Sequence, residues 1–312
     1  MAALPTRLLG DDGPEVSVIG LGCNNFGRRV DLDGTRAVVD AALEAGITFF
    51  DTSNTYGSPH GRSEEFLGEV LQGRRDRVVL ATKFGMDMGD GLGPRGSRDY
   101  ILQAVEASLR RLRTEVIDYY WYHQPDGVTP IAETLETLNG LVQAGTVRWI
   151  GASNFSAQQI EEADAVARER GFARFTSIQN QYSLLVRDPE HEVLPTCERL
   201  GLGFVPFFPL ASGLLTGKYR RGEAAPAGTR LADRARVATD EQFDVVEAVA
   251  RFAADRGISM IDIAIGTLLA KTPVSTVIAG ATKPEQVVVN VTAARWVPSD
   301  SDLTELEELL NR

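Results

Sequence analysis

The chain has 312 residues, and its content of 43% apolar and 24% charged residues is typical of a globular protein. The formal net charge of −11 disfavours contact with phosphate backbones and anionic lipids, so we expect no nucleic-acid partner and no membrane surface. The N-terminal segment is too short and polar for a signal peptide, and no apolar stretch reaches the roughly 18 residues of a membrane span. We therefore expect a cytoplasmic protein in which Cys23 and Cys197 are buried, reduced thiols.

The first predicted element is a β-hairpin, with strands at residues 7–9 and 16–18 around a turn rich in Asp, Gly and Pro. After it, short apolar segments alternate with helical patterns. Most of these segments are apolar throughout rather than at every second residue, which is typical of parallel strands covered on both faces. Eight such strands are predicted, at residues 19–23, 47–51, 78–83, 117–123, 147–151, 176–180, 204–208 and 276–280.

The segments between the strands carry apolar residues at helical spacing, with one stripe at residues 131, 135, 138 and 142 and another at 101, 104, 105, 109 and 112. Ser63 and Ser97 are predicted N-caps. Glycines follow the ends of the predicted helices, where the left-handed conformation is accessible to them: Gly46, Gly73, Gly145, Gly171, Gly201 and Gly257.

The strands recur about every 30 residues for most of the chain, which is one βα unit each. We therefore predict an α/β fold, a (β/α)8 TIM barrel with an N-terminal β-hairpin and two additional helices, as one domain over residues 1–312. The long connection before the last strand holds a polar loop at 220–240 and helices at 241–256 and 261–271, and a further helix is expected at 302–310. The alternative is a doubly wound open sheet, but the segment 20–24 lacks the third glycine of a dinucleotide-binding fingerprint.

Polar residues stand at the carboxyl ends of the predicted strands, where barrel enzymes place their active sites. Any one of these side chains could be structural, but all of them together are expected to converge on one opening. They are Asp51, Lys83, His123, Ser153, Asn154 and Gln179.

Several segments resemble the motifs of the aldo-keto reductase family, in order and over essentially the whole chain. They are FDTSNTYG at 50–57, TKFG at 82–85, DYYWYH at 118–123, GASNF at 151–155, QNQY at 179–182, PLASGLLTGKY at 209–219 and GATKPEQ at 280–286. The resemblance implies reduction of aldehydes or ketones to alcohols, or the reverse, with a nicotinamide cofactor.

The resemblance implies a catalytic tetrad in which Tyr56 donates the proton. Because a free phenol has a pKa near 10, a nearby Lys83 ammonium is expected to lower it, and a shift of about two units corresponds to roughly 2.7 kcal/mol. Asp51 would hold Lys83 by an ion pair, and His123 would orient or polarise the carbonyl group.

The implied cofactor is NADP(H), with NAD(H) possible. Ser153, Asn154 and Gln179 would hold its carboxamide, and Phe207 would stack on the nicotinamide ring. The pyrophosphate would lie at Leu210, Ser212 and Lys218. The adenosine end would lie at Gly280, Thr282, Lys283, Gln286 and Asn290, where Lys283 at a helix start would neutralise a 2′-phosphate. The chain departs from many relatives by having Phe207-Phe208 in place of Tyr-Ser, and Val289 in place of a glutamate.

The partner is expected to be a small carbonyl or alcohol substrate, and neither the substrate's identity nor the oligomeric state is predicted. The expected pocket rim is formed by Asn24, Asn25, Phe26, Phe84 and Trp121, and Gly85 is expected to leave the pocket open. The scattered histidines indicate no metal site.

Two other functions remain open. The chain could be a cofactor-binding partner subunit that resembles channel β subunits, although the complete tetrad favours turnover. It could also be a barrel enzyme that uses Lys83 to form a Schiff base, a role that an ion pair with Asp51 would oppose.

Overall fold

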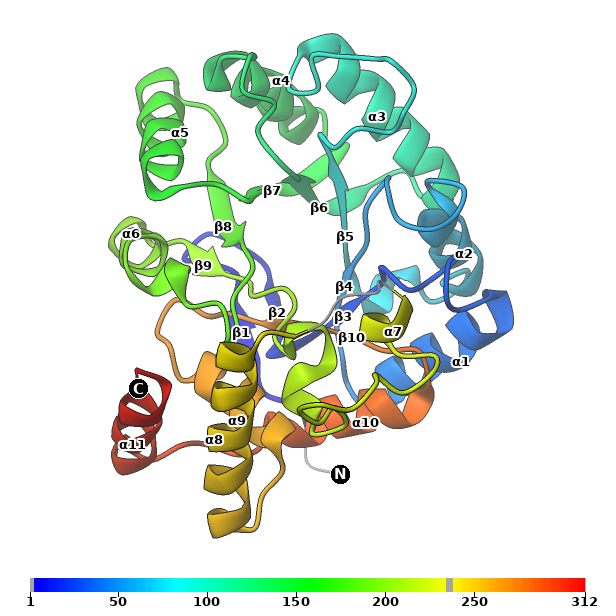
Figure 1. The fold of residues 1–312 in the computed structure, drawn as a ribbon. Coiled ribbons are helices and arrows are strands. Elements are labelled where there is room, and N and C mark those ends of the chain that lie inside the picture. The colour runs from blue at the N-terminus through cyan, green and yellow to red at the C-terminus, as the bar shows by residue number, and fades with distance from the viewer. Residues whose placement is uncertain (1–2, 234–237, 312) are drawn as a thin grey trace.

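The computed structural model describes residues 3–233 and 238–311, and its centre is a closed parallel barrel (Figure 1). The strand order is β10-β3-β4-β5-β6-β7-β8-β9, and bridges from Phe204 to Val274 and from Phe207 to Ile278 close the ring. The eight predicted strands and the (β/α)8 class are therefore confirmed. The strands are β3 (Ile19–Gly22), β4 (Phe49–Asp51), β5 (Val79–Phe84), β6 (Ile117–Tyr122), β7 (Val147–Ser153), β8 (Phe175–Gln179), β9 (Gly203–Phe204) and β10 (Val277–Gly280).

The seventh barrel strand, β9, is shorter than predicted, because it ends at Phe204 and not at Phe208. Pro206 has no N–H to donate to a strand ladder, and Phe208 takes a left-handed φ of 55° before Pro209. The chain therefore leaves the sheet, and Phe207 keeps only isolated bridges.

Helices surround the barrel, and they follow the apolar stripes of the sequence. Leu135 and Leu138 of one stripe and Ile101, Val105 and Leu112 of the other are buried. The helices beside the barrel are α1 (Leu32–Glu44), α2 (Arg62–Val70), α3 (Arg98–Leu112), α4 (Ile131–Gln143), α5 (Ala157–Arg170), α6 (Val193–Leu200), α9 (Met260–Leu269) and α10 (Pro284–Ala293).

The helices predicted at 241–256 and 302–310 are α8 (Asp240–Arg256) and α11 (Asp300–Leu310), which contact each other beside the barrel (Figure 1), and the helix predicted at 261–271 is α9. Shorter helical segments are α7 (Arg230–Asp233) and three 3-10 turns at Arg75–Arg77, Asp188–Glu190 and Ala211–Thr216. In the part of the chain that the structure describes, we find no helix with the length and apolarity of a membrane span.

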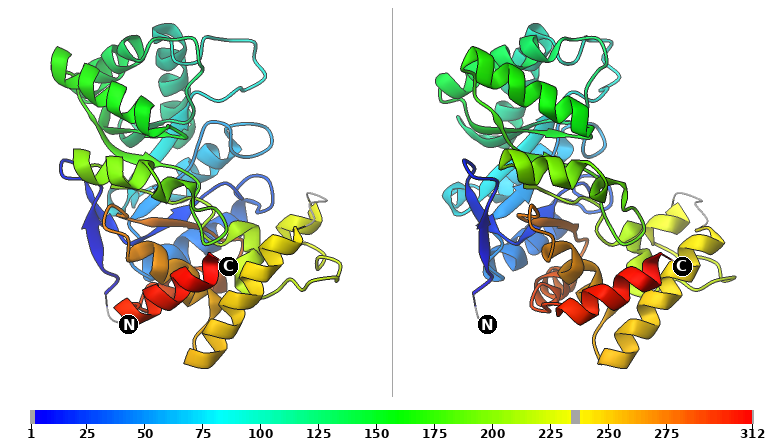
Figure 2. Two further views of the ribbon diagram at one scale, coloured as in Figure 1. Left: turned by 60° about the vertical axis from the view of Figure 1, so that its left-hand side comes forward. Right: turned by 90° about the vertical axis from the view of Figure 1, so that its left-hand side faces the viewer.

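The predicted N-terminal hairpin is confirmed as β1 (Thr6–Leu8) paired antiparallel with β2 (Glu15–Ser17). It covers one end of the barrel, and the long loops project from the opposite end (Figure 2). Leu9 and Val16 are fully buried and pack in one cluster with Phe49, Tyr119 and Trp121 of the barrel interior. The hairpin therefore plugs the amino-terminal end of the barrel.

One predicted helix start is wrong. Helix α2 begins at Arg62 after Gly61, whose φ is 85°, and Ser63 lies inside the first turn. The buried Ser63 hydroxyl instead donates to the Cys23 carbonyl at 2.9 Å, which ties this helix to the end of β3. Ser97 does occupy the N-cap position of α3, but its hydroxyl donates to the Pro94 carbonyl.

Candidate active site

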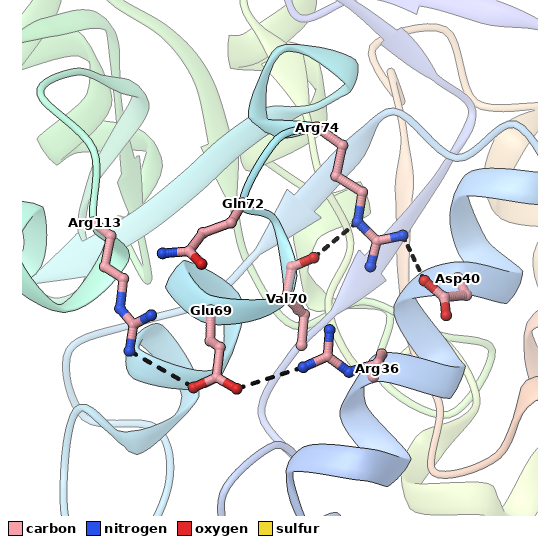
Figure 3. A pocket seen from close by; sticks show the side chains of 7 residues that line it. All are labelled: Arg36, Asp40, Glu69, Val70, Gln72, Arg74 and Arg113. Carbon is pink, nitrogen blue, oxygen red and sulfur yellow. Dashed lines mark hydrogen bonds and ion pairs between the residues drawn. The ribbon is translucent and has the colours of Figure 1, made fainter.

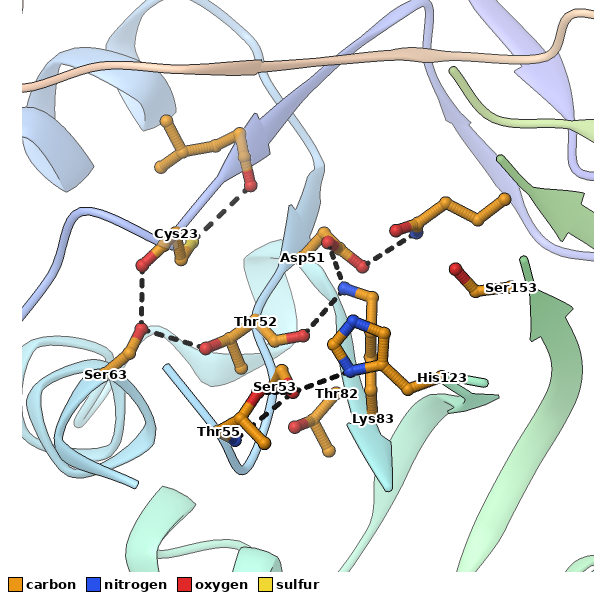
Figure 4. A network of polar contacts seen from close by, with 12 residues as sticks. Cys23, Asp51, Thr52, Ser53, Thr55, Ser63, Thr82, Lys83, His123 and Ser153 are labelled. Atoms are coloured by element: carbon orange, nitrogen blue, oxygen red, sulfur yellow. Dashed lines mark hydrogen bonds and ion pairs between the residues drawn. The ribbon is translucent and has the colours of Figure 1, made fainter. Parts of the chain in front are cut away.

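The structure brings Asp51, Lys83 and His123 together at the carboxyl end of the barrel (Figure 4). Asp51 ends β4, Lys83 lies near the end of β5, and His123 follows β6; all three are buried. Parallel strands end at one edge, so their last inward side chains meet there. The Lys83 ammonium donates to the Asp51 carboxylate and to the Thr52 carbonyl, the latter at 2.9 Å. The expected ion pair is therefore present.

The ion pair keeps Lys83 charged. Burial lowers the pKa of Lys83, but the charge of Asp51 and its hydrogen bond outweigh this effect and leave the pKa above its usual value. Burial raises the pKa of Asp51, against the opposing effects of Lys83 and of the Gln179 amide, which donates at 3.1 Å. A Schiff-base lysine needs a lowered pKa, so the alternative function for Lys83 does not fit this site.

Tyr56 lies in the loop after β4, and its half-buried ring packs against Lys83 and His123. The ring meets His123 edge-on at 6.0 Å, and the Lys83 nitrogen is 5.2 Å from the ring centre. Burial raises the pKa of Tyr56, and Lys83 only partly offsets this rise. The expected net lowering of this pKa is therefore wrong, because the loss of hydration outweighs one neighbouring charge. At neutral pH the phenol keeps its proton, which is the state that a proton donor requires.

His123 is a neutral imidazole at physiological pH. Burial and the nearby Lys83 charge hold the pKa of His123 well below its usual range. Its Nδ1 lies 3.1 Å from the Ser53 hydroxyl, and its backbone N–H donates to Phe84. The sequence analysis missed Ser53, although its place between Asp51 and Tyr56 was a signal that it lies at the site.

The three side chains expected at the carboxamide lie next to this group. Ser153 and Gln179 are buried. Asn154 is exposed, and its backbone has the left-handed conformation, with a φ of 60°. The Asn154 amide donates to the Ser153 hydroxyl at 3.1 Å and to the His123 carbonyl at 2.9 Å. One of the two Gln179 amide N–H groups donates to Asp51, so the second N–H and the carbonyl oxygen are left for a further ligand.

The remaining expected cofactor residues lie in two loops. Phe207 is partly exposed, with its ring edge-on to Phe208 at 5.2 Å, and it is followed by the partly exposed Leu210 and Ser212 and the exposed Lys218. In the loop after β10, Gly280, Lys283 and Gln286 are exposed and Thr282 is partly exposed. Lys283 is the N-cap of α10, and Thr282 donates to Gln286 through its N–H at 2.7 Å. Asn290 differs, because only 5% of it is exposed.

The expected pocket rim is wrong for Phe26, Phe84 and Trp121, each of which is fully buried. Successive side chains of a strand face opposite sides, so Phe84 turns away from the mouth that Lys83 faces, and it stacks on Tyr122 at 5.0 Å. Trp121 lies in the barrel interior, 4.5 Å from the ring of Tyr119.

Asn24 is partly exposed, whereas Asn25 is buried and donates to the Ala281 carbonyl. Gly85 has a φ of 103°, and a Cβ there would lie 2.7 Å from Tyr122. Its missing side chain therefore accommodates Tyr122 and does not widen the pocket, contrary to expectation.

A polar pocket of about 720 Å³ lies beside the Tyr56 loop. Arg62 of this pocket is paired with Glu65 at 2.7 Å, and the positive charge of Arg28 and Arg29 favours an anionic ligand group. Its lining includes Gly27, Arg28, Arg29, Asp31, Ser58, Arg62 and Thr282.

A second pocket, of about 590 Å³, is lined by residues of α1, the end of α2 and the segments after α2 and α3 (Figure 3). Its arginines are engaged in ion pairs, since Arg36 and Arg113 contact Glu69 and Arg74 contacts Asp40. No residue of the tetrad lines it.

Comparison with known proteins places the chain among reductases. A family model described as "Aldo/keto reductase family" matches residues 18–311, which include every barrel strand. A protein of Oryza sativa subsp. japonica named "Probable voltage-gated potassium channel subunit beta" is 36% identical over 304 residues, 93% of this chain and 91% of that protein. The L-glyceraldehyde 3-phosphate reductase of Escherichia coli (strain K12) is 33% identical over 302 residues, 92% of this chain and 86% of the reductase. An uncharacterized oxidoreductase of Bacillus subtilis (strain 168) is 42% identical over 237 residues, 73% of this chain and 72% of that protein.

Proposed function

This chain belongs to the aldo/keto reductase family of NAD(P)H-dependent oxidoreductases, and we propose that it interconverts carbonyls and alcohols with Tyr56 as proton donor and acceptor. The observation that carries this proposal is the buried Asp51–Lys83 pair at the barrel mouth, with the Tyr56 ring held between Lys83 and His123. Carbonyl reduction requires a proton at oxygen, and the protonated Tyr56 phenol is the acid available at this position.

The other three members of the tetrad each have a distinct task. The Lys83 charge stabilises the phenolate that remains after the proton leaves, and it limits the rise in the pKa of Tyr56 caused by burial. Asp51 fixes the position of Lys83. His123, held neutral, orients the carbonyl group through a hydrogen bond rather than competing with Tyr56 as an acid.

The hydride must come from a nicotinamide cofactor, because no side chain donates one. The donor set fits such a group, since Ser153, Asn154 and the free oxygen of Gln179 form a polar cluster adjoining Asp51. We propose that these residues hold the carboxamide and that Phe207 covers the ring. Leu210, Ser212 and Lys218 would bind the pyrophosphate. Gly280, Thr282, Lys283, Gln286 and Asn290 would receive the adenosine end.

We propose NADP(H) as the cofactor, with NAD(H) also possible. The arginine-rich pocket contains Thr282 in its lining, so positive charge lies beside the loop expected to hold the adenosine end. A 2′-phosphate adds negative charge to that end of the cofactor, which such a pocket favours.

The substrate is proposed to be a small aldehyde or ketone. Because a relative with 33% identity is an L-glyceraldehyde 3-phosphate reductase, phosphorylated aldehydes belong in the first substrate screen. A second function, that of a cofactor-binding partner subunit, is kept because a relative with 36% identity is named a probable channel subunit. Turnover measured as loss of NADPH absorbance separates the two functions.

The test is the variant Tyr56→Phe assayed with 4-nitrobenzaldehyde and NADPH. We expect reduction to be abolished while NADPH still quenches tryptophan fluorescence. The matched control is Tyr120→Phe, because the buried Tyr120 hydroxyl has no hydrogen-bond partner among the described residues and its removal should leave turnover unchanged. Near-wild-type turnover in Tyr56→Phe would refute the assigned role.

A further inference from the structure

Ser53 and His123 form a buried contact that the catalytic scheme above leaves unused. The Ser53 hydroxyl lies 3.1 Å from Nδ1 of His123, and Ser53 is fully buried (Figure 4). Since His123 is neutral, its ring carries one N–H, which is on either Nδ1 or Nε2. The hydrogen bond at one ring nitrogen decides which nitrogen keeps the proton.

The hydrogen bonds around Ser53 are compatible with its own proton lying toward His123. The Ser53 oxygen accepts the Thr55 backbone N–H at 3.3 Å, and the Thr55 hydroxyl, at 3.0 Å, can donate to it as well. A hydroxyl has one proton and two lone pairs, so these two bonds fill the acceptor capacity of Ser53 when the Thr55 hydroxyl is the donor. Two other acceptors are in reach of the Ser53 proton, the Thr55 hydroxyl at 3.0 Å and the more distant Asn54 side-chain oxygen at 3.4 Å.

We propose that the Ser53 hydroxyl donates to Nδ1 of His123 and thereby places the single imidazole proton on Nε2, so that the Nε2–H group donates a hydrogen bond to the substrate's carbonyl oxygen. This inference rests on the proposed function. Ser53 is then a positioning residue, because it acts on the substrate only through His123. In the opposite tautomer, Nε2 would present a lone pair to the carbonyl oxygen, and two acceptors cannot hydrogen-bond to each other.

The chain makes the tautomer directly measurable, because it contains only three histidines, His60, His123 and His191. Protein labelled with ¹⁵N-histidine reports the tautomer of each ring through its nitrogen shifts, and His123→Gln identifies the His123 signals. In the wild-type protein we expect the Nε2–H tautomer at His123. A wild-type spectrum with the Nδ1–H tautomer would overturn the proposal, whatever any variant does.

The variant Ser53→Ala supplies the kinetic half of the test. It should shift His123 toward a mixture of tautomers and lower kcat about tenfold, while the Kd for NADPH stays unchanged. Ser53→Thr keeps the hydroxyl and should restore both the tautomer and most of kcat. The matched control is Ser177→Ala, since Ser177 is equally buried but bonds to Tyr119.

The two proposals fail in different ways. An unchanged tautomer and unchanged kcat in Ser53→Ala, in a protein that Tyr56→Phe inactivates, would overturn the role of Ser53 alone. Full activity in Tyr56→Phe would overturn the proposed function and, with it, the catalytic use of the tautomer.

Discussion

The buried ion pair behind the active site gives a prediction about stability. Glu64 of α2 is fully buried, and its two oxygens accept from the Thr82 hydroxyl and from Nε of Arg111, each at 2.6 Å. The Arg111 side chain is 21% exposed. In Arg111→Met the Glu64 carboxylate would lose its ion pair with Arg111 while keeping its hydrogen bond from Thr82. Removing one partner of a buried pair costs about 3–5 kcal/mol, and the partial access of water at Arg111 places this case near 3 kcal/mol.

The assay is urea unfolding followed by tryptophan fluorescence, with a double-mutant cycle. Glu64→Gln combined with Arg111→Met removes both charges, so we expect it to cost less than the single Arg111→Met change. Glu64 contacts Thr82, which precedes Lys83, and it lies in α2, which follows the Tyr56 loop. A disturbed Glu64 should therefore disturb the catalytic residues, so activity should fall in Arg111→Met and recover in the double variant. A loss below about 1 kcal/mol in Arg111→Met, or a double variant whose loss equals the sum of both singles, would refute the reasoning.

Three further predictions concern the pH dependence of activity, a buried carboxylate with two ion pairs, and the packing of the barrel interior. Burial holds the pKa of Tyr56 above its usual value and the pKa of His123 well below its usual value. We therefore expect kcat/KM for reduction to stay level from about pH 6 to 9 and to fall only above about pH 10. An inflection near about pH 6.5 would contradict this expectation. Asp118→Ala removes partners of Arg75 and Arg148 at the plugged end of the barrel, and calorimetry should show a loss of about 2–4 kcal/mol with unchanged kcat. Gly151→Ala would place a Cβ 2.6 Å from Trp121, and thermal unfolding should reveal a loss of about 1–3 kcal/mol.

The architecture follows from the sequence because each strand is a short apolar segment bounded by glycine or polar residues. The exception is β9, where the phenylalanines at 207 and 208 extend the apolar pattern beyond a proline that ends the ladder. The position of the ion pair was also predictable, since strand ends converge in a barrel. The burial of Phe84 and Trp121 was not, because a strand covered on both faces has no alternation to indicate which way a side chain turns.

The pKa shifts and the long-range contacts of the site could not be predicted from the sequence. The sequence identifies Lys83 as a charge near Tyr56, but it does not show how much water the phenol loses, and that loss decides the direction of its pKa. Likewise, the Ser53–His123 contact joins residues 70 positions apart, so no local pattern reports it.

The plug formed by the hairpin has a consequence for ligand exchange. With Leu9 and Val16 packed under the interior rings, the described barrel offers its carboxyl end as the route to Lys83. A reactant and a dinucleotide that share this one opening would each block the entry and exit of the other. The molecule lying deeper must then enter first and depart last, so steady-state kinetics should follow a compulsory sequence of arrivals and departures.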